Sequence, residues 1–511
     1  MNLTTDPWIP VVWNDGATRP ASLTDIFARG HEIRDLAVRP HERIALLRLF
    51  LCVAHAALAG PRDREEWEDC LARLPAVAKD YLQRRQPAFE LFGDGQRFLQ
   101  VSNLKAMKAS DDGNSVSKLD MALATGNTPT LFDNSGGDGR AFLPEQIALL
   151  LLTFQCFSPG GTIGVALWDQ KPTPGWKSYP KPAPGQSSHA PCLPGSMLHA
   201  FPRGANLLAT IHLNLLTRDT VITLPGIKDW GHPVWEKMPS SPADKPSIAN
   251  ATETYLGRLV SLSRAIHLDS DGRGLLLANA VDYPSWPEAR EASATIVVRT
   301  IKGQPDRFVL GASLDKAPWR ELHALTVKSA FLKDAGGPPA LNNLAGDQAF
   351  DLWVGGLVAD KAKVLDTLEG VYHVPAAMLA SVGQQRYADG VQFAEKTAWA
   401  LKRAVTVYHA EIGDKLDRPE ARDRRNALQN KATFQFWTQA ERDLPLLLAA
   451  VESSAPLADM PAWAQSAWGQ TVNRTARLAY ETSCPHDTAR QLQAFVKGLA
   501  VLFQNSANQS K

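Results

Sequence analysis

The sequence predicts an α+β protein, with a large mixed α/β N-terminal domain over residues 1–370 and a C-terminal four-helix bundle over residues 371–511. Two observations predict this class. Short extended segments alternate with helical segments in the first part of the chain, and strand patterns stop near residue 370. The length of 511 residues is also about three times the ~150-residue prior for one domain, so two or three domains are expected.

The first elements are a strand, a turn and two helices. Trp8–Trp13 followed by Asn14-Asp15-Gly16 is typical of a strand that enters a turn. Apolar residues at helical spacing predict a buried helix over 41–59 and a second helix over roughly 144–157. The second helix is expected to end at Ser158-Pro159-Gly160-Gly161, because proline and glycine terminate helices.

Proline and glycine then recur from about residue 158 to residue 200, with few periodic apolar positions. A segment of this length without regular structure is usually functional or disordered. Regular structure is expected to return at Leu207–Leu216. A hairpin is predicted where Ile296–Ile301 and Arg307–Leu310 flank Lys302-Gly303-Gln304.

The last part of the chain reads as helices joined by short loops, which predicts a bundle. Asp487 is the expected N-cap of the last helix, and Pro445 is expected to kink or split its helix. The helical stretches lie near 394–408, 431–453, 461–482 and 492–502.

Composition and charge exclude several classes of protein. The chain is 44% hydrophobic and 21% charged with a net charge of +1, which excludes a disordered chain and a uniformly basic nucleic-acid coat. Five cysteines without a Cys-x-x-Cys pattern argue against a disulfide framework and a zinc ribbon. No signal peptide is visible, and the longest apolar run, Ile147–Phe154, is far short of a membrane span. We therefore expect a cytoplasmic protein with no membrane partner.

Common catalytic motifs are incomplete in this sequence. No Gly-x-Gly-x-x-Gly, Walker A, Gly-x-Ser-x-Gly or His-Glu-x-x-His pattern is present. What remains is two glycine-rich loops, 134–140 and 160–161, whose bare backbone can approach a phosphate or a groove floor closely. This favours binding over turnover, and no cofactor is expected.

One metal-binding alternative stays open. His189, Cys192 and His199, with Cys156 as a possible fourth ligand, could form the centre of a metal-dependent hydrolase. Their spacing matches no standard zinc pattern, and zinc requires four well-placed ligands. We therefore favour no metal site.

The charged segment 402–431 has two interpretations. Basic and acidic residues both occur in it, which favours a solvated helix–loop–helix connection over a nucleic-acid or partner patch. Phe434, Phe436 and Trp437, which follow it, are more typical of a bundle core than of a base-stacking platform.

Six segments, taken together and in this order, carry a family resemblance. They are Asp6–Val11, Gln155–Gly161, Phe201–Leu207, Leu213–Leu216, Trp353–Leu357 and Phe434–Gln439. The set resembles the CasA family, the large subunits of Cascade, which is the type I-E CRISPR surveillance complex. The resemblance implies the two-part architecture above and a non-catalytic role. In such complexes the guide RNA reads the target by base pairing, while this subunit recognises a short adjacent motif in double-stranded DNA through the minor groove.

The resemblance also implies partners. These are double-stranded target DNA, the guide RNA, and the backbone, small and guide-handle-binding subunits of the complex. A nuclease-helicase is expected to be recruited after target binding. The subunit is expected to promote local duplex opening and R-loop formation.

The resemblance assigns DNA-binding roles to several positions. The family's glycine loop corresponds to Pro159, Gly160 and Gly161, with Gly164 close behind. Its first mobile loop falls at about 125–140, with Phe132 at the aromatic position and Asn134 beside it. Bare backbone at the glycine loop could enter the minor groove.

The family's wedge, which separates the first base pairs, corresponds to Lys361, Ala362 and Lys363. Lysine stands where the best-known members have glutamine, so an amide acceptor for a base is missing. Arg273 is the candidate for the family's lysine finger, and a plain turn residue before the strand 275–277 is an equal alternative. A passive scaffold is a third functional reading, in which substitutions at Gly160 or at the two lysines leave DNA binding unchanged.

Overall fold

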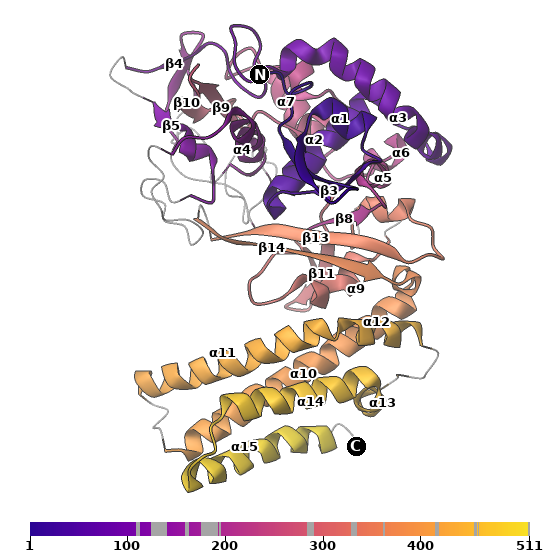
Figure 1. Cartoon of the computed structure of the whole chain (residues 1–511), viewed down its shortest axis with the longest axis vertical. Helices are drawn as coiled ribbons and strands as arrows, with labels where there is room; N and C mark the ends of the chain where they lie inside the picture. The colour runs from indigo at the N-terminus through magenta and orange to yellow at the C-terminus, as the bar shows by residue number, and fades with distance from the viewer. Residues whose placement is uncertain are drawn as a thin grey trace. The chain divides into compact units, whose positions relative to one another are not determined.

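The computed structural model describes residues 1–108, 113–123, 140–158, 163–174, 193, 196–283, 291–328, 335–360, 363–413, 418–453, 457 and 459–508, of which positions 360, 363, 460 and 503–508 are described by their backbone alone. The predicted α+β class is confirmed: strands and helices mix in the first part of the chain, and the C-terminal part is helical (Figure 1). The chain forms two compact units. The first comprises 1–318, 328–345 and 350–373, and the second comprises 319–327, 346–349 and 374–511.

The first unit opens with a small antiparallel sheet in the order β2-β1-β3. The predicted strand and turn at its start are confirmed, because β1 runs over Ile9–Trp13 and Gly16 adopts a left-handed φ of 83° before β2. The strands of the first unit are β1 (Ile9–Trp13), β2 (Thr18–Ala21), β3 (Ile33–Leu36), β4 (Leu104–Ala106), β5 (Asn114–Ser115), β6 (Ala166–Trp168), β7 (Lys171–Pro172), β8 (His199–Arg203), β9 (Arg264–Leu268), β10 (Gly274–Asn279), β11 (Ile296–Ile301), β12 (Gln304–Val309), β13 (Phe350–Asp360) and β14 (Lys363–Val374).

Helices cover these sheets. They are α1 (Leu23–Ala28), α2 (Pro40–Leu58), α3 (Arg64–Arg85), α4 (Pro144–Phe157), α5 (Leu207–Leu213), α6 (Arg218–Val221), α7 (Lys245–Glu253) and α8 (Tyr255–Leu259), with short 3₁₀ helices η1 (Gln86–Phe89), η2 (Val116–Leu119), η4 (Val234–Glu236) and η6 (Pro339–Asn343). The two helices predicted from apolar periodicity are confirmed as α2 and α4. Both are buried on most of their surface, so they form the centre of the first unit's core.

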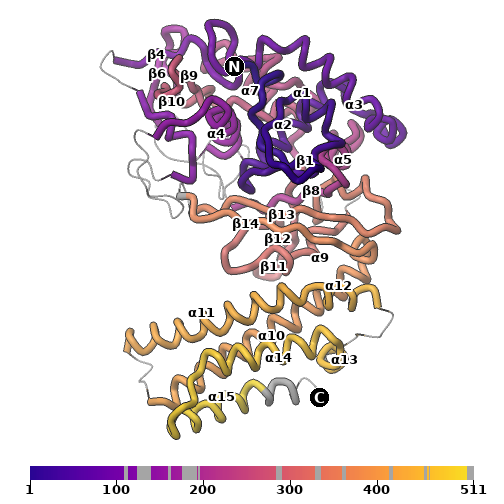
Figure 2. Tube along the Cα trace, viewed as in Figure 1, coloured from indigo at the N-terminus to yellow at the C-terminus, as the bar shows by residue number. Residues whose placement is uncertain are grey.

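Three further antiparallel sheets position the candidate site. Their strand orders are β5-β10-β9, β4-β6-β7 and β14-β13-β8, and β13 and β14 run side by side as one long hairpin (Figure 2). The predicted hairpin at 296–310 is also confirmed. Its strands β11 and β12 are joined by Lys302 and Gly303, both with positive φ, as a two-residue hairpin turn requires.

The second unit is the predicted helical bundle, with α10 packed against α11, α14 and α15. Pro445 splits its helix as expected, since α11 ends at Arg442 and α12 begins at Leu444. The helices of this unit are α9 (Leu322–Leu325), α10 (Ser381–Glu411), α11 (Pro419–Arg442), α12 (Leu444–Glu452), α13 (Met460–Gln465), α14 (Ala467–Ser483) and α15 (Ala489–Asn508), with short 3₁₀ helices η5 (Pro318–Glu321) and η7 (Ala376–Leu379) at its edge.

The N-cap of α15 differs from the sequence prediction. Thr488, not Asp487, caps the helix: the Thr488 hydroxyl accepts from the Gln491 amide at 3.3 Å, and the Gln491 side chain accepts from the Thr488 amide at 3.1 Å. The Leu492 amide also donates to the Thr488 carbonyl at 2.8 Å, which places the helix start one residue later than expected. Asp487 is therefore one position too early to cap.

Replacing Thr488 with alanine is expected to lower the unfolding free energy of the bundle by about 1 kcal/mol, since a helix loses its capping acceptor. Urea unfolding of the full chain, followed by far-UV circular dichroism, measures the loss. Asp487→Ala is the control, and we expect it to change stability much less. Equal effects of the two substitutions would contradict the assignment of the cap.

Candidate nucleic-acid interface

A buried polar cluster holds the end of α4, directly before the predicted glycine loop. The Ser158 side chain is fully buried, and its hydroxyl accepts from the Arg264 Nε at 2.6 Å. Arg264 also donates through Nη1 to Asn279 Oδ1 at 2.7 Å, and Asn279 Nδ2 donates to the Pro174 carbonyl at 2.8 Å. The end of α4 and the segment that follows β7 are therefore tied to strands β9 and β10.

Gln155, one turn earlier in α4, completes this cluster. Its amide nitrogen donates to the carbonyls of Leu99 and Arg264 at 3.1 and 2.9 Å, and its amide oxygen accepts from the Arg264 backbone N–H at 2.8 Å. Gln155 is 1% exposed, so its polar atoms require partners inside the protein. The last turn of α4 is consequently fixed to β9.

A second cluster holds the end of the β13–β14 hairpin. The Ser196 hydroxyl donates to the Ala359 carbonyl at 2.9 Å and accepts from the Ala359 amide at 2.8 Å, while the Ser196 amide donates to the Leu357 carbonyl at 3.0 Å. Gly356 permits this approach, because a Cβ there would lie 2.5 Å from the Met197 carbonyl oxygen. The hairpin end is thus bound to the chain just before β8.

The chain between Leu193 and Ser196 connects these two clusters. The Leu193 amide donates to the Cys156 carbonyl at 2.8 Å, at the end of α4. Ser196, three residues after Leu193, is hydrogen-bonded to Ala359 at the end of the hairpin. Because a chain spans at most ~3.6 Å per residue, the Cα atoms of Leu193 and Ser196 are no more than about 11 Å apart. The end of α4 and the end of the β13–β14 hairpin are therefore held close together.

Most residues that the sequence assigned to DNA binding lie outside the described residues. Gly164 is described and exposed, and among the described residues a Cβ there would have only the Leu277 carbonyl oxygen within 4 Å, at 3.5 Å. For Lys363 the backbone is described, at the first position of β14. The residues outside the described ranges are Phe132, Asn134, Pro159, Gly160, Gly161, Lys361 and Ala362.

Arg273 lies on the exposed turn between β9 and β10, and the strand predicted after it is confirmed as β10. Its amide donates to Asp271 Oδ1 at 3.0 Å. The preceding Gly272 packs beside Ile147, near the start of α4. Ile147 is ten residues from Phe157, or about 15 Å along the helix at ~1.5 Å per residue. The turn that carries Arg273 is therefore at the opposite end of α4 from Ser158, the last described residue before the glycine loop.

The metal alternative gains no support from the described residues. His199 is buried in β8, its Nδ1 lies 2.8 Å from the Ser293 hydroxyl, and burial lowers its pKa to about 3, so the ring is neutral. Cys156 is buried, and His189 and Cys192 lie outside the described ranges. Across the parts of the chain that the structure describes, no three His, Cys, Asp or Glu side chains gather in a way that could hold a metal ion.

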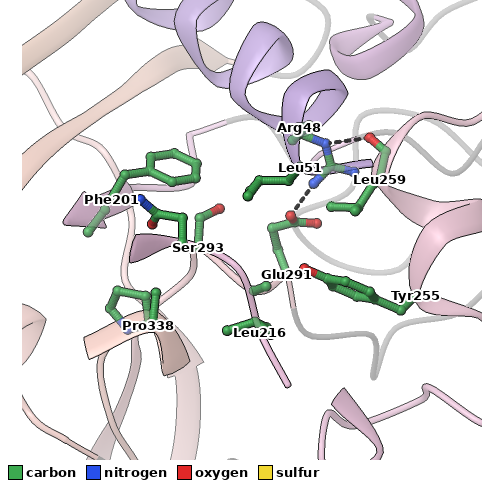
Figure 3. Close-up of a pocket in the computed structure, with 13 residues that line it drawn as sticks. Arg48, Leu51, Phe201, Leu216, Tyr255, Leu259, Glu291, Ser293 and Pro338 are labelled. Carbon is green, nitrogen blue, oxygen red and sulfur yellow. Dashed lines mark hydrogen bonds and ion pairs between the residues drawn. The ribbon is translucent and has the colours of Figure 1, made fainter. Parts of the chain in front are cut away.

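Sequence reasoning missed a buried ion pair between Arg48 and Glu291 (Figure 3). Arg48 stands in the buried helix α2 and also donates to the carbonyls of Leu259 and Arg258, at 2.9 and 2.6 Å. Burial alone would raise the pKa of Glu291, but the Arg48 charge and hydrogen bond hold it below its ordinary value. The charge of Arg48, placed within an apolar run of the sequence, was the signal that could have revealed the pair.

A small cavity of about 20 Å³ lies beside this pair, lined in part by Tyr255 and Ser293 (Figure 3). This volume accommodates roughly one water molecule. The cavity is therefore too small for an organic ligand.

The aromatic cluster of α11 differs in part from the prediction. Phe436 is fully buried in the bundle core, and Trp437 is partly buried with the Arg320 guanidinium 3.9 Å from its ring centroid. Phe434 is 73% exposed, so its assignment to the core is wrong. The helix places residue 434 on the face opposite its buried side, which residue-type frequencies cannot indicate.

The charged segment 402–431 spans the end of α10 and the first half of α11. Its basic side chains at Lys402, Arg403, Arg418, Arg422, Arg424 and Lys431 are exposed. Trp399, one turn before Arg403, is 59% exposed, with the Arg403 guanidinium 4.8 Å from its ring centroid.

Among the described helices, none combines the length and apolar character needed to cross a membrane.

Comparisons with known proteins identify relatives over nearly the whole chain. The model of the family described as CRISPR-associated protein Cse1 matches residues 2–479. The CRISPR-associated protein CasA/Cse1 of Thermus thermophilus is 29% identical over 537 residues, which cover 97% of this chain and 95% of that protein.

Solved structures share the fold. The crystal structure of Thermus thermophilus CasA matches with a TM-score of 0.72 and 22% identity, covering 99% of this chain and 98% of that one. Cse1 from Acidimicrobium ferrooxidans matches with a TM-score of 0.73 and 19% identity, covering 100% and 98%. A chain of a CRISPR RNA-guided surveillance complex matches with a TM-score of 0.65 and 17% identity, covering 98% and 99%.

The mixed first unit, the helical second unit and these relatives define a CRISPR-associated protein. The chain belongs to the Cse1 family, since the family model matches most of its length. The resemblance to CasA that six sequence segments carry is confirmed.

Proposed function

We propose that this chain is the non-catalytic large subunit of a type I-E CRISPR surveillance complex. It recognises a short motif beside the target in double-stranded DNA through the minor groove, and it promotes opening of the adjacent base pairs and R-loop formation. Membership of the Cse1 family carries this proposal. The relative in a CRISPR RNA-guided surveillance complex supports assembly with a guide RNA and other subunits.

The geometry at the end of α4 supports motif recognition. The candidate glycine loop follows Ser158, whose buried hydroxyl is bonded to Arg264, so it departs from a rigid base. Glycine backbone fits a minor groove of about 6 Å width, where larger side chains would clash.

The spacing between the two clusters supports a link between recognition and opening. Leu193 and Ser196, which bind the end of α4 and the hairpin end, are at most about 11 Å apart. This upper limit equals the length of about three base pairs at ~3.4 Å per pair. A motif of a few base pairs and the first pair to be opened would thus be reached from neighbouring elements of the first unit.

The bundle is proposed to contact other subunits and the displaced DNA strand. Two large side chains support a binding face on it: Trp399 is 59% exposed and Phe434 is 73% exposed. The proposed partners remain the target duplex, the guide RNA, the backbone, small and guide-handle-binding subunits, and a recruited nuclease-helicase. A cytoplasmic location belongs to this proposal.

Duplex binding by the guide-loaded partner complex, with and without this chain, tests the function. Targets carry a randomised flanking trinucleotide and are titrated at one fixed salt concentration, because phosphate contacts make affinity salt-dependent. We expect the chain to increase affinity for some flanks by about tenfold or more, since each specified base pair contributes ~1–3 kcal/mol.

An equal increase for every flank would contradict motif recognition and favour a passive scaffold. Absence of any increase would also remove the proposed role in DNA binding. The unsupplemented partner complex, titrated on the same duplexes, is the control for binding by base pairing alone.

A further inference from the structure

We propose that Ser196 is a positioning residue that locks the end of the β13–β14 hairpin to the end of α4, so that motif recognition and duplex opening are coupled. The coupling of recognition to opening rests on the proposed function, whereas the attachment of the hairpin end by Ser196 rests on geometry alone. Ser196 touches no DNA in this proposal. It acts through Ala359, which lies next to the last residue of β13.

The hairpin needs such a lock because its sheet partner ends early. β8 pairs with β13 only over Asp351–Gly355, whereas β13 continues to Asp360. A two-stranded hairpin alone is marginally stable in water. Along the last five residues of β13, on the edge that β8 no longer covers, the chain at Ser196 supplies hydrogen-bond partners.

The Ser196 side chain takes the place of a neighbouring strand at Ala359. A neighbouring strand would offer one carbonyl and one amide to Ala359, and the single Ser196 hydroxyl supplies both an acceptor at 2.8 Å and a donor at 2.9 Å. A hydroxyl can do this because it carries one donor and two acceptor sites. Alanine or glycine at this position would leave both Ala359 groups without these partners.

The backbone of Ser196 is held in an uncommon conformation by its neighbours. Its φ is +61°, in the left-handed region that non-glycine residues rarely adopt. The Ser196 amide donates to the Leu357 carbonyl at 3.0 Å, and the Ser196 carbonyl accepts from the Ala312 amide at 2.6 Å. An uncommon conformation retained by this many bonds is typical of a functional constraint.

The lock links two elements that are far apart in sequence. Leu193, three residues before Ser196, binds the Cys156 carbonyl in the last turn of α4. A shift of the hairpin end away from α4 that exceeds the reach of these three residues would therefore break the bonds at Ser196 or the bond at Leu193. While both sets of bonds are intact, the three-residue spacing between Leu193 and Ser196 limits how far the hairpin end can move from the end of α4.

The test compares Ser196→Gly and Ser196→Ala in the full chain within the guide-loaded complex. Glycine removes the hydroxyl and tolerates the positive φ, so this variant folds even if the alanine variant does not. Ser313→Ala is the matched control, because the Ser313 hydroxyl also accepts from a backbone amide, that of Asp315 at 3.2 Å, and Asp315 lies outside β13.

The first readout is amide hydrogen exchange of the free chain, which does not depend on DNA. We expect the Ala359 amide to exchange about tenfold faster in Ser196→Gly, from the loss of bonds to its amide and carbonyl. Ser313→Ala leaves this rate unchanged. Unaltered exchange at Ala359 in Ser196→Gly would overturn the lock, whatever the function of the chain.

The second readout separates recognition from opening. The probe is a duplex with 2-aminopurine at the first base pair beside the flank that the wild type prefers. We expect Ser196→Gly to keep the flank preference and to lower the rate of fluorescence increase on opening by about tenfold. A purely structural role would lower both signals together, by reducing the amount of active complex.

The outcomes of the two proposals can be distinguished. If the wild type shows a flank preference and Ser196→Gly opens the duplex at the wild-type rate, the coupling is wrong and the proposed function stands. If the wild type shows no flank preference, the proposed function fails, and faster Ala359 exchange still reports the lock.

Discussion

The substitution Gly160→Asp is expected to reduce the affinity of the assembled complex for duplexes with the preferred flank by about tenfold to a hundredfold, the range that corresponds to ~1–3 kcal/mol for one specified position. A side chain on the glycine loop would occupy space that bare backbone leaves free in the narrow groove. Its carboxylate would also be repelled by the flanking phosphates. Titration of duplexes with preferred and scrambled flanks, at one salt concentration, measures the loss.

The charge-matched control is Gly95→Asp. Gly95 is exposed, its φ is not positive, and a Cβ there would meet no atom of the described part of the chain within 4 Å. Both variants add one negative charge to the chain, so a general electrostatic effect would lower affinity equally in the two. Equal losses, or a Gly160→Asp loss that is the same for scrambled flanks, would remove the glycine loop from motif recognition.

The double substitution Lys361→Ala with Lys363→Ala discriminates further between recognition of the motif and opening of the duplex. The scaffold alternative expects no effect of either set of substitutions on DNA binding. The proposed function expects a clear loss of DNA binding with either set. Because it places the glycine loop in recognition and the lysine pair in opening, the complex with the two lysines replaced binds less tightly but keeps its flank preference.

Local patterns predicted the elements whose signals lie within one segment. The helix over 144–157 is bounded by proline and by a Ser-Pro-Gly-Gly sequence, and it is observed over those residues. The hairpin at Lys302-Gly303 has a glycine in its turn, a residue that adopts positive φ without strain, and it too is observed. In these places the physical determinants are periodicity and backbone preference, which a single sequence displays.

The contacts that build the candidate site were not predictable in this way. Ser196 lies 163 residues from Ala359, and Arg264 lies 106 residues from Ser158. No local periodicity reports such pairs, since they arise only when distant strands and helices meet. The composition of the segment 158–200 predicted a functional or disordered stretch without regular structure, whereas the short strands β6 and β7 lie within it, and composition gave no partner for any of its residues.

Single side chains were mispredicted where residue type conflicted with position. Phe434 was assigned to the core because aromatic residues are usually buried, and it is exposed because its helix face points away from the core. Arg48 interrupts an apolar run of the sequence, a position that favours an uncharged residue, and it is buried because Glu291 and two carbonyls compensate its charge.

The substitution Arg48→Met is expected to lower the unfolding free energy of the first unit by about 3–5 kcal/mol, the cost of leaving a buried ionised partner unpaired. Methionine keeps much of the length of arginine, so the loss reports the charge and hydrogen bonds more than the packing. The carbonyls of Leu259 and Arg258 lose a donor at the same time. Urea unfolding of the full chain at pH 7, followed by tryptophan fluorescence, measures the loss.

The surface ion pair Arg64–Glu68 provides the control, because it joins two exposed residues at 2.9 Å. Arg64→Met is expected to cost at most ~1 kcal/mol, as is usual for exposed pairs. A loss for Arg48→Met within this range would mean that Glu291 is neutralised or solvated at little cost.

The pH dependence identifies the source of the loss. In the wild type the pKa of Glu291 is below its ordinary value, so the pair's contribution is complete above about pH 4.3, the value of an unfolded Glu, and declines as the pH falls through the lowered pKa. Without Arg48, no neighbouring guanidinium from α2 offsets the rise in the Glu291 pKa that burial causes, so this pKa increases. The folded variant then binds a proton at Glu291 more readily than the unfolded chain does. The difference in stability between the wild type and Arg48→Met should therefore shrink as the pH falls from about 7 towards about 4.5. A difference that stays constant over this range would assign the loss to the two carbonyls, because their hydrogen bonds do not titrate.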